Sequence, residues 1–148
     1  MMNTIARQFV PFALAIAAGT GIIVTPFVTA AQAAELSDAG SFKASDRGYA
    51  ANGSIQIIQL KDGGRAIKLS SAFKVRSGPD LRVWLSASSN PTSAGSVKNA
   101  RHIDLGKLKS NKGKQVYRIP AGVDISKLNS VVIWCRAFGV NFGGATLG

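Results

Sequence analysis

The stretch Ser130-Val131-Val132-Ile133-Trp134-Cys135-Arg136 constrains the fold more than any other part of the chain. Its three successive β-branched residues are stiff at the first side-chain torsion and suit a pleated strand better than a helix. Side chains alternate along a strand, so Trp134 and Cys135 are expected on opposite faces. Apart from Arg136 both faces are apolar, which is typical of a strand covered on both sides. The pattern predicts a central strand that carries the only cysteine of the chain.

Short apolar segments separated by turn residues fill the rest of the chain. Asp62-Gly63-Gly64 supplies the positive backbone torsions of a tight hairpin, and Asp124 is placed to cap one helical turn over 124–128. Residues 87–100 are rich in Ser, Asn, Pro and Gly and are expected to form a surface loop. Strands are expected at 54–60, 65–69, 72–75, 81–86, 102–106, 115–120, 131–135 and 138–142, with a brief edge strand at 41–43. This predicts an all-β protein, an antiparallel β-sandwich or barrel of about eight short strands with one short helical turn.

The N-terminal segment has the character of an export signal. Arg7 is the last charge before Glu35, the run between them is apolar, and Ala31-Gln32-Ala33-Ala34 ends it with the small residues that a signal peptidase reads. The run is long enough to span a bilayer, so an uncleaved membrane anchor is the alternative. We expect residues 1–33 to be a signal peptide, residues 34–148 to form a single β domain, and the protein to be periplasmic or extracellular.

The chain is strongly basic, with 18 Lys and Arg against 7 Asp and Glu, and the loss of Arg7 with the signal leaves a net charge of +10. Such a charge keeps a surface solvated, and it also attracts polyanions such as anionic lipid headgroups or acidic polysaccharide. Nucleic acid is a poor partner for an exported chain without a basic helix or an aromatic-lined groove. The densest cationic segment, a candidate anion-binding site, contains Lys107, Lys109, Lys112 and Lys114.

The chain lacks the residues that most metal sites and enzymatic sites require. Zinc sites need three or four good ligands and blue copper needs two histidines with a cysteine, whereas the chain has only His102 and Cys135. Covalent haem attachment through Cys-x-x-Cys-His is impossible with one cysteine. A non-covalent haem remains open, with Cys135, His102 or a tyrosine as axial ligand. No catalytic constellation extends beyond one Cys and one His, and Asp80 lies where a turn uses an aspartate.

Cys135 is therefore the residue whose role decides the functional interpretation. A single cysteine in an exported chain is a buried thiol, a partner in an intermolecular bond or a working sulfur. Thiols react as thiolates, which nearby cations favour, but Arg136 is expected on the opposite face of the strand from the sulfur. A working sulfur needs a polar neighbour or an opening to the outside; one sealed among aliphatic groups would leave only a basic scaffold.

Several of these segments in this order resemble the DM-thirteen domain, a small all-β extracellular domain. They are Phe73-Lys74-Val75, Gly78-Pro79-Asp80-Leu81-Arg82-Val83-Trp84-Leu85-Ser86, Leu105-Gly106-Lys107-Leu108-Lys109, Gln115-Val116-Tyr117-Arg118-Ile119-Pro120 and Val131-Val132-Ile133-Trp134-Cys135, with Phe138 and Phe142. The resemblance covers about residues 42–147. It implies electron transfer, with the family's cysteine, here Cys135, as a bare thiol or as the ligand of a group such as haem. Relatives often carry a histidine where this chain has Tyr49; if that histidine helps to bind a cofactor, this chain lacks it.

Two functional hypotheses follow. The first is an exported redox module that works through Cys135, with Trp134 shaping its surroundings and a membrane or cell-surface protein as its redox partner. The second is a non-redox binding domain whose lysine segment recognises an anionic envelope component or a protein partner. His102, Tyr49 and Asp80 are second-tier candidates for the redox site.

Overall fold

The computed structural model describes residues 35–148, so the predicted signal peptide lies outside the described residues. Every paired strand is antiparallel, and the strands form two four-stranded sheets and one two-stranded sheet. The elements are β1 (Glu35–Ser41), β2 (Ala51–Asn52), β3 (Ser54–Gln59), β4 (Arg65–Leu69), β5 (Lys74–Val75), β6 (Leu81–Ser86), α1 (Ala94–Asn99), β7 (His102–Lys107), β8 (Gln115–Ile119), the 3-10 turn η1 (Ile125–Lys127), β9 (Ser130–Cys135) and β10 (Val140–Thr146).

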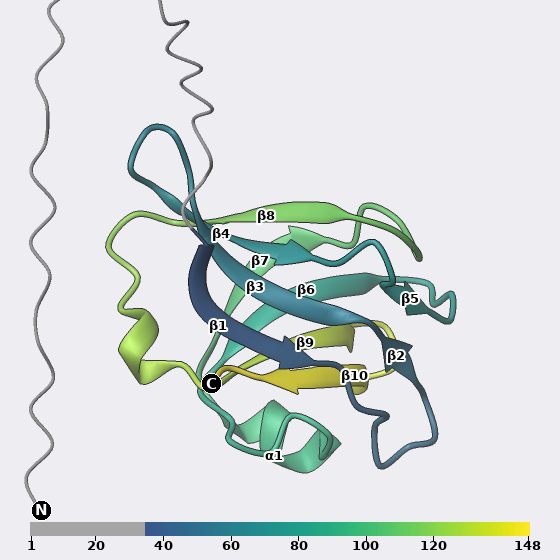
Figure 1. Cartoon of the computed structure of the whole chain (residues 1–148). Helices are drawn as coiled ribbons and strands as arrows, with labels where there is room; N and C mark the ends of the chain where they lie inside the picture. Colours follow the sequence, from purple (N-terminus) through teal and green to yellow (C-terminus); the bar gives the residue numbers. More distant parts are fainter. Residues whose placement is uncertain (1–34) are drawn as a thin grey trace, which may run out of the picture. The chain divides into compact units, whose positions relative to one another are not determined.

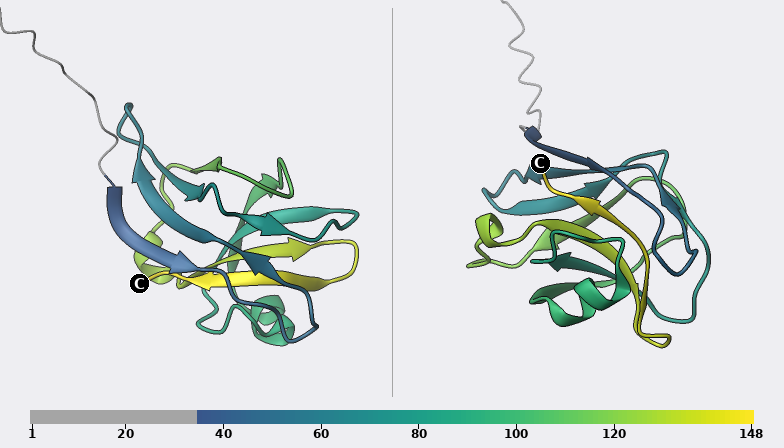
Figure 2. Two further views of the ribbon diagram at one scale, coloured as in Figure 1. Left: turned by 45° about the vertical axis from the view of Figure 1, so that its right-hand side comes forward. Right: turned by 90° about the horizontal axis from the view of Figure 1, so that it is seen from below.

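The two larger sheets, β1-β3-β4-β8 and β10-β9-β6-β7, lie face to face (Figures 1 and 2). Each contributes alternate side chains to one core, for example Ile57 and Ile67 from the first sheet and Val83 and Ile133 from the second. The expected all-β sandwich is thereby confirmed, and within residues 35–148 the sheets do not close into a barrel.

The predicted central strand has the expected place. β9 lies between β10 and β6, and all six of its residues are buried. The hairpin at Asp62–Gly64 joins β3 to β4, and Asp124 caps η1 by accepting a hydrogen bond from the Ser126 amide. Period-two alternation and turn chemistry are therefore sufficient to place these elements.

Other segments differ from expectation. The predicted loop 87–100 contains the helix α1, whose first turn is capped by the Ser93 side chain accepting from the Ser96 amide. The last strand begins at Val140 rather than Phe138, because Gly139 adopts a positive φ and donates to the Cys135 carbonyl in a tight turn. The first strand is β1, which pairs with β3 over Glu35–Ser41 instead of residues 41–43.

A second, smaller apolar cluster lies on the outer face of the β10-β9-β6-β7 sheet. It contains Trp84, Val132 and Trp134 together with Val97 from α1. The helix therefore covers a patch of sheet that faces away from the main core. Between residues 35 and 148 no helix has the length and apolar character that crossing a bilayer requires.

Candidate functional site

Cys135 is the last residue of β9 and lies inside the main core. It pairs with Leu81 of β6 and Val140 of β10, and its exposed fraction is 0%. Strand alternation places it on the inner face with Val131 and Ile133, as expected. Within residues 35–148 its thiol has no hydrogen-bond partner. The sulfur is therefore shielded from solvent and from any reagent that must touch it.

An aromatic pair covers the core near the β9–β10 hairpin, in which Cys135 is the last residue of β9. The ring of Tyr49 stacks on Phe142 of β10, with centroids 4.0 Å apart and an interplanar angle of 11°. Phe142 belongs to the same core cluster as Cys135, and Tyr49 packs against that cluster. Beyond them Phe138, in the β9–β10 turn, is 56% exposed. The tyrosine therefore has a packing role that its position in the sequence does not reveal.

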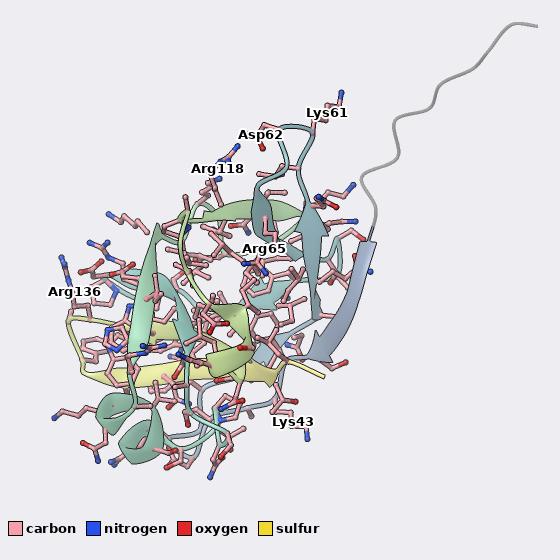
Figure 3. The ribbon with its side chains drawn as sticks, turned by 90° about the vertical axis from the view of Figure 1, so that its left-hand side faces the viewer. Lys43, Lys61, Asp62, Arg65, Arg118 and Arg136 are labelled. Carbon is pink, nitrogen blue, oxygen red and sulfur yellow. The ribbon has the colours of Figure 1, made fainter. Side chains whose placement is uncertain are left out.

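A charge network surrounds Asp80 at the start of β6. Its carboxylate accepts from Arg136 Nε at 2.6 Å and from Arg82 Nε at 3.1 Å, and its carbonyl accepts from the Arg136 amide. Burial alone would raise the pKa of Asp80, but the hydrogen bonds and charges of Arg82 and Arg136 outweigh it and hold that pKa below its ordinary value. The side chain of Arg136 points outward (Figure 3) and is tied to this carboxylate. It supplies no cation to the neighbouring sulfur.

Trp134 lies on the opposite face of β9 from Cys135 and belongs to a stack of three rings. Its indole stacks on that of Trp84 on β6, with centroids 4.6 Å apart and an angle of 16°. Trp84 stacks in turn on the imidazole of His102 on β7, at 3.7 Å and 10°. Trp134 and Trp84 are 4% and 7% exposed, whereas His102 is exposed. The stack thus runs along the outer face of the sheet, from the exposed ring on β7 to the buried ring on β9.

A hollow of about 560 Å³ opens at the exposed end of this stack. It is lined by Arg101, His102, Ile103, Ala121, Gly122, Val123, Asp124 and Lys127. Asp124 accepts hydrogen bonds from Ser126, which together with Lys127 lower the pKa of its carboxyl group. Arg65 reaches over the same segment to donate to the Val123 carbonyl (Figure 3). Cys135 does not line this hollow.

The lysine segment is only partly free to bind a ligand. Lys109 donates to the Val116 carbonyl at 2.6 Å and lies over the Tyr117 ring, so it is used within the domain. Lys112 forms an antiparallel bridge with Lys74 of β5, which the sequence did not connect to it. We define the basic edge as Lys74, Arg76, Lys112 and Lys114, all exposed and none ion-paired with a carboxylate among residues 35–148. Lys107 lies outside it, opposite Arg82.

The residues of the candidate site do not fit a haem. The sulfur of Cys135 is sealed in the core, and it is not among the residues that line the hollow beside His102. Tyr49 uses its ring to cover Phe142. Two axial ligands from these three residues would require the sandwich to open. Among residues 35–148 no three His, Cys, Asp or Glu side chains gather into a metal-binding group.

Comparison with known proteins gives one positive result. A family model described as DM13, Electron transfer DM13, matches residues 41–147. No curated protein and no solved structure matches the chain.

Proposed function

We propose an exported electron-transfer role for this chain, which belongs to the electron transfer DM13 family. The match spans nearly all of the described β domain, and it confirms the resemblance seen in the sequence. We further propose that Cys135 is the redox group of the module. The observation that supports this choice is its position: the only sulfur of the domain ends the central strand, next to a tryptophan whose ring stack reaches the surface.

The sealed sulfur of Cys135 excludes direct reaction and ligation, the two roles expected from the sequence, so a redox role remains for it only if no contact with the sulfur is needed. Thiol–disulfide exchange needs direct attack on or by the sulfur, and a sulfur with no exposed surface cannot take part without unfolding. Transfer of a single electron needs no such contact, because an electron can cross a layer of protein to a partner docked outside. We therefore propose outer-sphere transfer: the thiol loses one electron to a one-electron oxidant on the partner, its proton passes to a water molecule that enters the core transiently, and both return on reduction.

The partner is proposed to be a redox protein of the membrane or cell surface. This rests on the N-terminal sequence, whose apolar run and Ala-x-Ala end are typical of a secretory signal. An exported domain meets electron donors and acceptors on the outer side of the membrane. The same sequence feature supports a location in the periplasm or outside the cell, which we propose with it.

Voltammetry of the full chain tests the role of the sulfur. We expect a reversible one-electron couple in the parent protein and its loss in Cys135→Ala. Val131→Ala is the matched control, because Val131 is equally buried on the same face of β9. A couple that survives in Cys135→Ala would show that the cysteine only fills the core; loss in both variants would assign the effect to loosened packing.

A second candidate function, binding of an anionic envelope component, is favoured by the basic edge. Lys74 and Lys112 face each other directly across a β-bridge, and like charges so placed destabilise a sheet. A bound anion would relieve that repulsion. If so, binding to anionic lipid vesicles should fall steeply with salt and weaken in Lys74→Glu/Lys112→Glu. The control Lys61→Glu/Lys98→Glu makes the same change in net charge elsewhere; equal weakening in both would reduce the basic edge to a solvated surface.

A further inference from the structure

The three stacked rings of Trp134, Trp84 and His102 span three neighbouring strands on the outer face of one sheet. Each comes from a different strand, and the strands are adjacent in the order β9, β6, β7. Trp84 is directly opposite Val132 and Asp104, so its ring contacts lie on diagonals rather than between paired residues. Aromatic rings can bridge such diagonals. The result is one continuous column of π systems.

The column has one buried end and one open end. The indoles are sealed by Val132 and by Val97 of α1, whereas His102 lines the hollow at the surface. The buried end is Trp134, whose chain neighbour is Cys135. Electron transfer is rapid between aromatic rings in close contact, and the rings are stacked at both steps of the column. The rings thus offer a path along the outer face of the sheet, from the exposed His102 to the residue before the sulfur.

We propose that His102, Trp84 and Trp134 form an electron relay that opens to a redox partner at the hollow beside His102. The inference deepens the proposed electron-transfer function and rests on it for its physiological meaning. The alternative is that the rings serve only as apolar packing, which buried indoles provide in any case. The two hypotheses differ in whether a tryptophan radical forms when an electron is removed at His102.

The chemistry of the relay balances in single electrons. An oxidant at His102 takes one electron from the indole of Trp84, leaving a radical cation, and Trp134 then donates an electron to Trp84. The radical cation at Trp134 is filled in turn by a reductant, which under the proposed function is the thiol of Cys135. Trp84 Nε1 is buried without a hydrogen-bond partner, so no acceptor stands ready to take its proton. The Trp84 intermediate should therefore be the protonated radical cation rather than the neutral radical.

The single histidine of the chain makes this testable without redesign. A ruthenium polypyridyl complex is attached to His102 of the full chain. A light flash excites the complex, and an external quencher then oxidises it by one electron. We expect a tryptophan radical cation in transient absorption and electron paramagnetic resonance, and its loss in Trp84→Phe. A radical that forms at the parent rate in Trp84→Phe would overturn the relay.

The matched control moves the label off the stack. In His102→Gln/Lys98→His the complex sits on α1, beside Val97, which packs on the same tryptophans without stacking. We expect slower radical formation from this position, and an equal rate would overturn the relay even if Trp84→Phe failed to fold. This experiment does not depend on Cys135. If no tryptophan radical forms while the voltammetric couple of the sulfur remains, only the relay is wrong. If the couple is absent while the radical forms, only the role of Cys135 is wrong.

Discussion

At the scale of single residues, the proposed function depends on a sulfur that no reagent can reach in the folded domain. Cys135 has the position that its sequence predicts, on the inner face of the central strand, and the burial that the sequence leaves open. Its neighbour Arg136 is tied to Asp80 and gives the sulfur no cation. A sealed sulfur of this kind favours outer-sphere transfer over exchange or ligation.

The burial predicts a specific chemical behaviour of the thiol. Thiol reagents should modify Cys135 only as fast as the domain unfolds, because reaction needs both an accessible sulfur and a thiolate. Alkylation rates measured across a urea gradient should therefore follow the global unfolding transition seen by circular dichroism. Rapid modification well below that transition would mean that the β9–β10 hairpin opens locally and that the sulfur is within reach.

Substitutions at Cys135 should separate polarity from size. Cys135→Ser puts a hydroxyl where the sulfur has no hydrogen-bond partner, and we expect a loss of about 1–3 kcal/mol in the free energy of unfolding. Cys135→Ala removes only a small apolar group and should cost less than Cys135→Ser. Urea unfolding of both variants measures the difference. Equal stability of the two would indicate that a polar group or a water stands at this site.

At the scale of elements, the outer layer is held by close backbone contacts. Gly144 of β10 lies against Pro91, and a Cβ built at Gly144 would approach the Pro91 carbonyl oxygen to 2.6 Å. Gly144→Ala should therefore destabilise the domain by about 1–3 kcal/mol. Gly95→Ala in α1 is the control, since its nearest atom is 4.0 Å away and alanine should gain about 0.5–1 kcal/mol in a helix. Thermal unfolding that shows the same sign for both would contradict this packing.

The Asp80 network joins the start of β6 to the end of β9, and it should make stability depend on pH. Because the pKa of Asp80 is lower in the folded state, its contribution is full above the ordinary carboxyl pKa of about 3.9 and is lost as the pH falls toward the folded value. Asp80→Asn should therefore be less stable than the parent at neutral pH, with a gap that narrows on acidification. Urea unfolding at neutral and at acidic pH measures this difference in the free energy of unfolding. A difference that stays constant would show that the carboxylate charge is not responsible.

How far the sequence predicts these elements depends on the signal each one carries. Alternation places β3, β4, β6 and β9, and Asp124 marks η1. The helix α1 is missed because six residues with Gly and Ser look like a loop, although Ser93 is a good cap. The ring stack is missed because it depends on which strands are neighbours and in what register. Cross-strand contacts of that kind, including the Lys74–Lys112 bridge, have no local signature.

At the scale of the whole molecule, the sandwich separates two environments across one sheet. The inner face encloses Cys135 in an apolar core, and the outer face carries an aromatic column from Trp134 to the exposed His102. The basic edge lies at β5 and the β7–β8 connection. Such a layout keeps a sulfur from exchange chemistry while leaving it within one residue of a path to the surface.

The most direct test of the account is the midpoint potential of the full chain measured as a function of pH. If the Cys135 thiol releases one proton with each electron, the potential should fall by about 59 mV per pH unit while the thiol is protonated, because one proton and one electron are coupled. The same couple should be absent from Cys135→Ala and present in Val131→Ala. A couple that is independent of pH, or one that persists without the sulfur, would contradict the claim that Cys135 is the redox group.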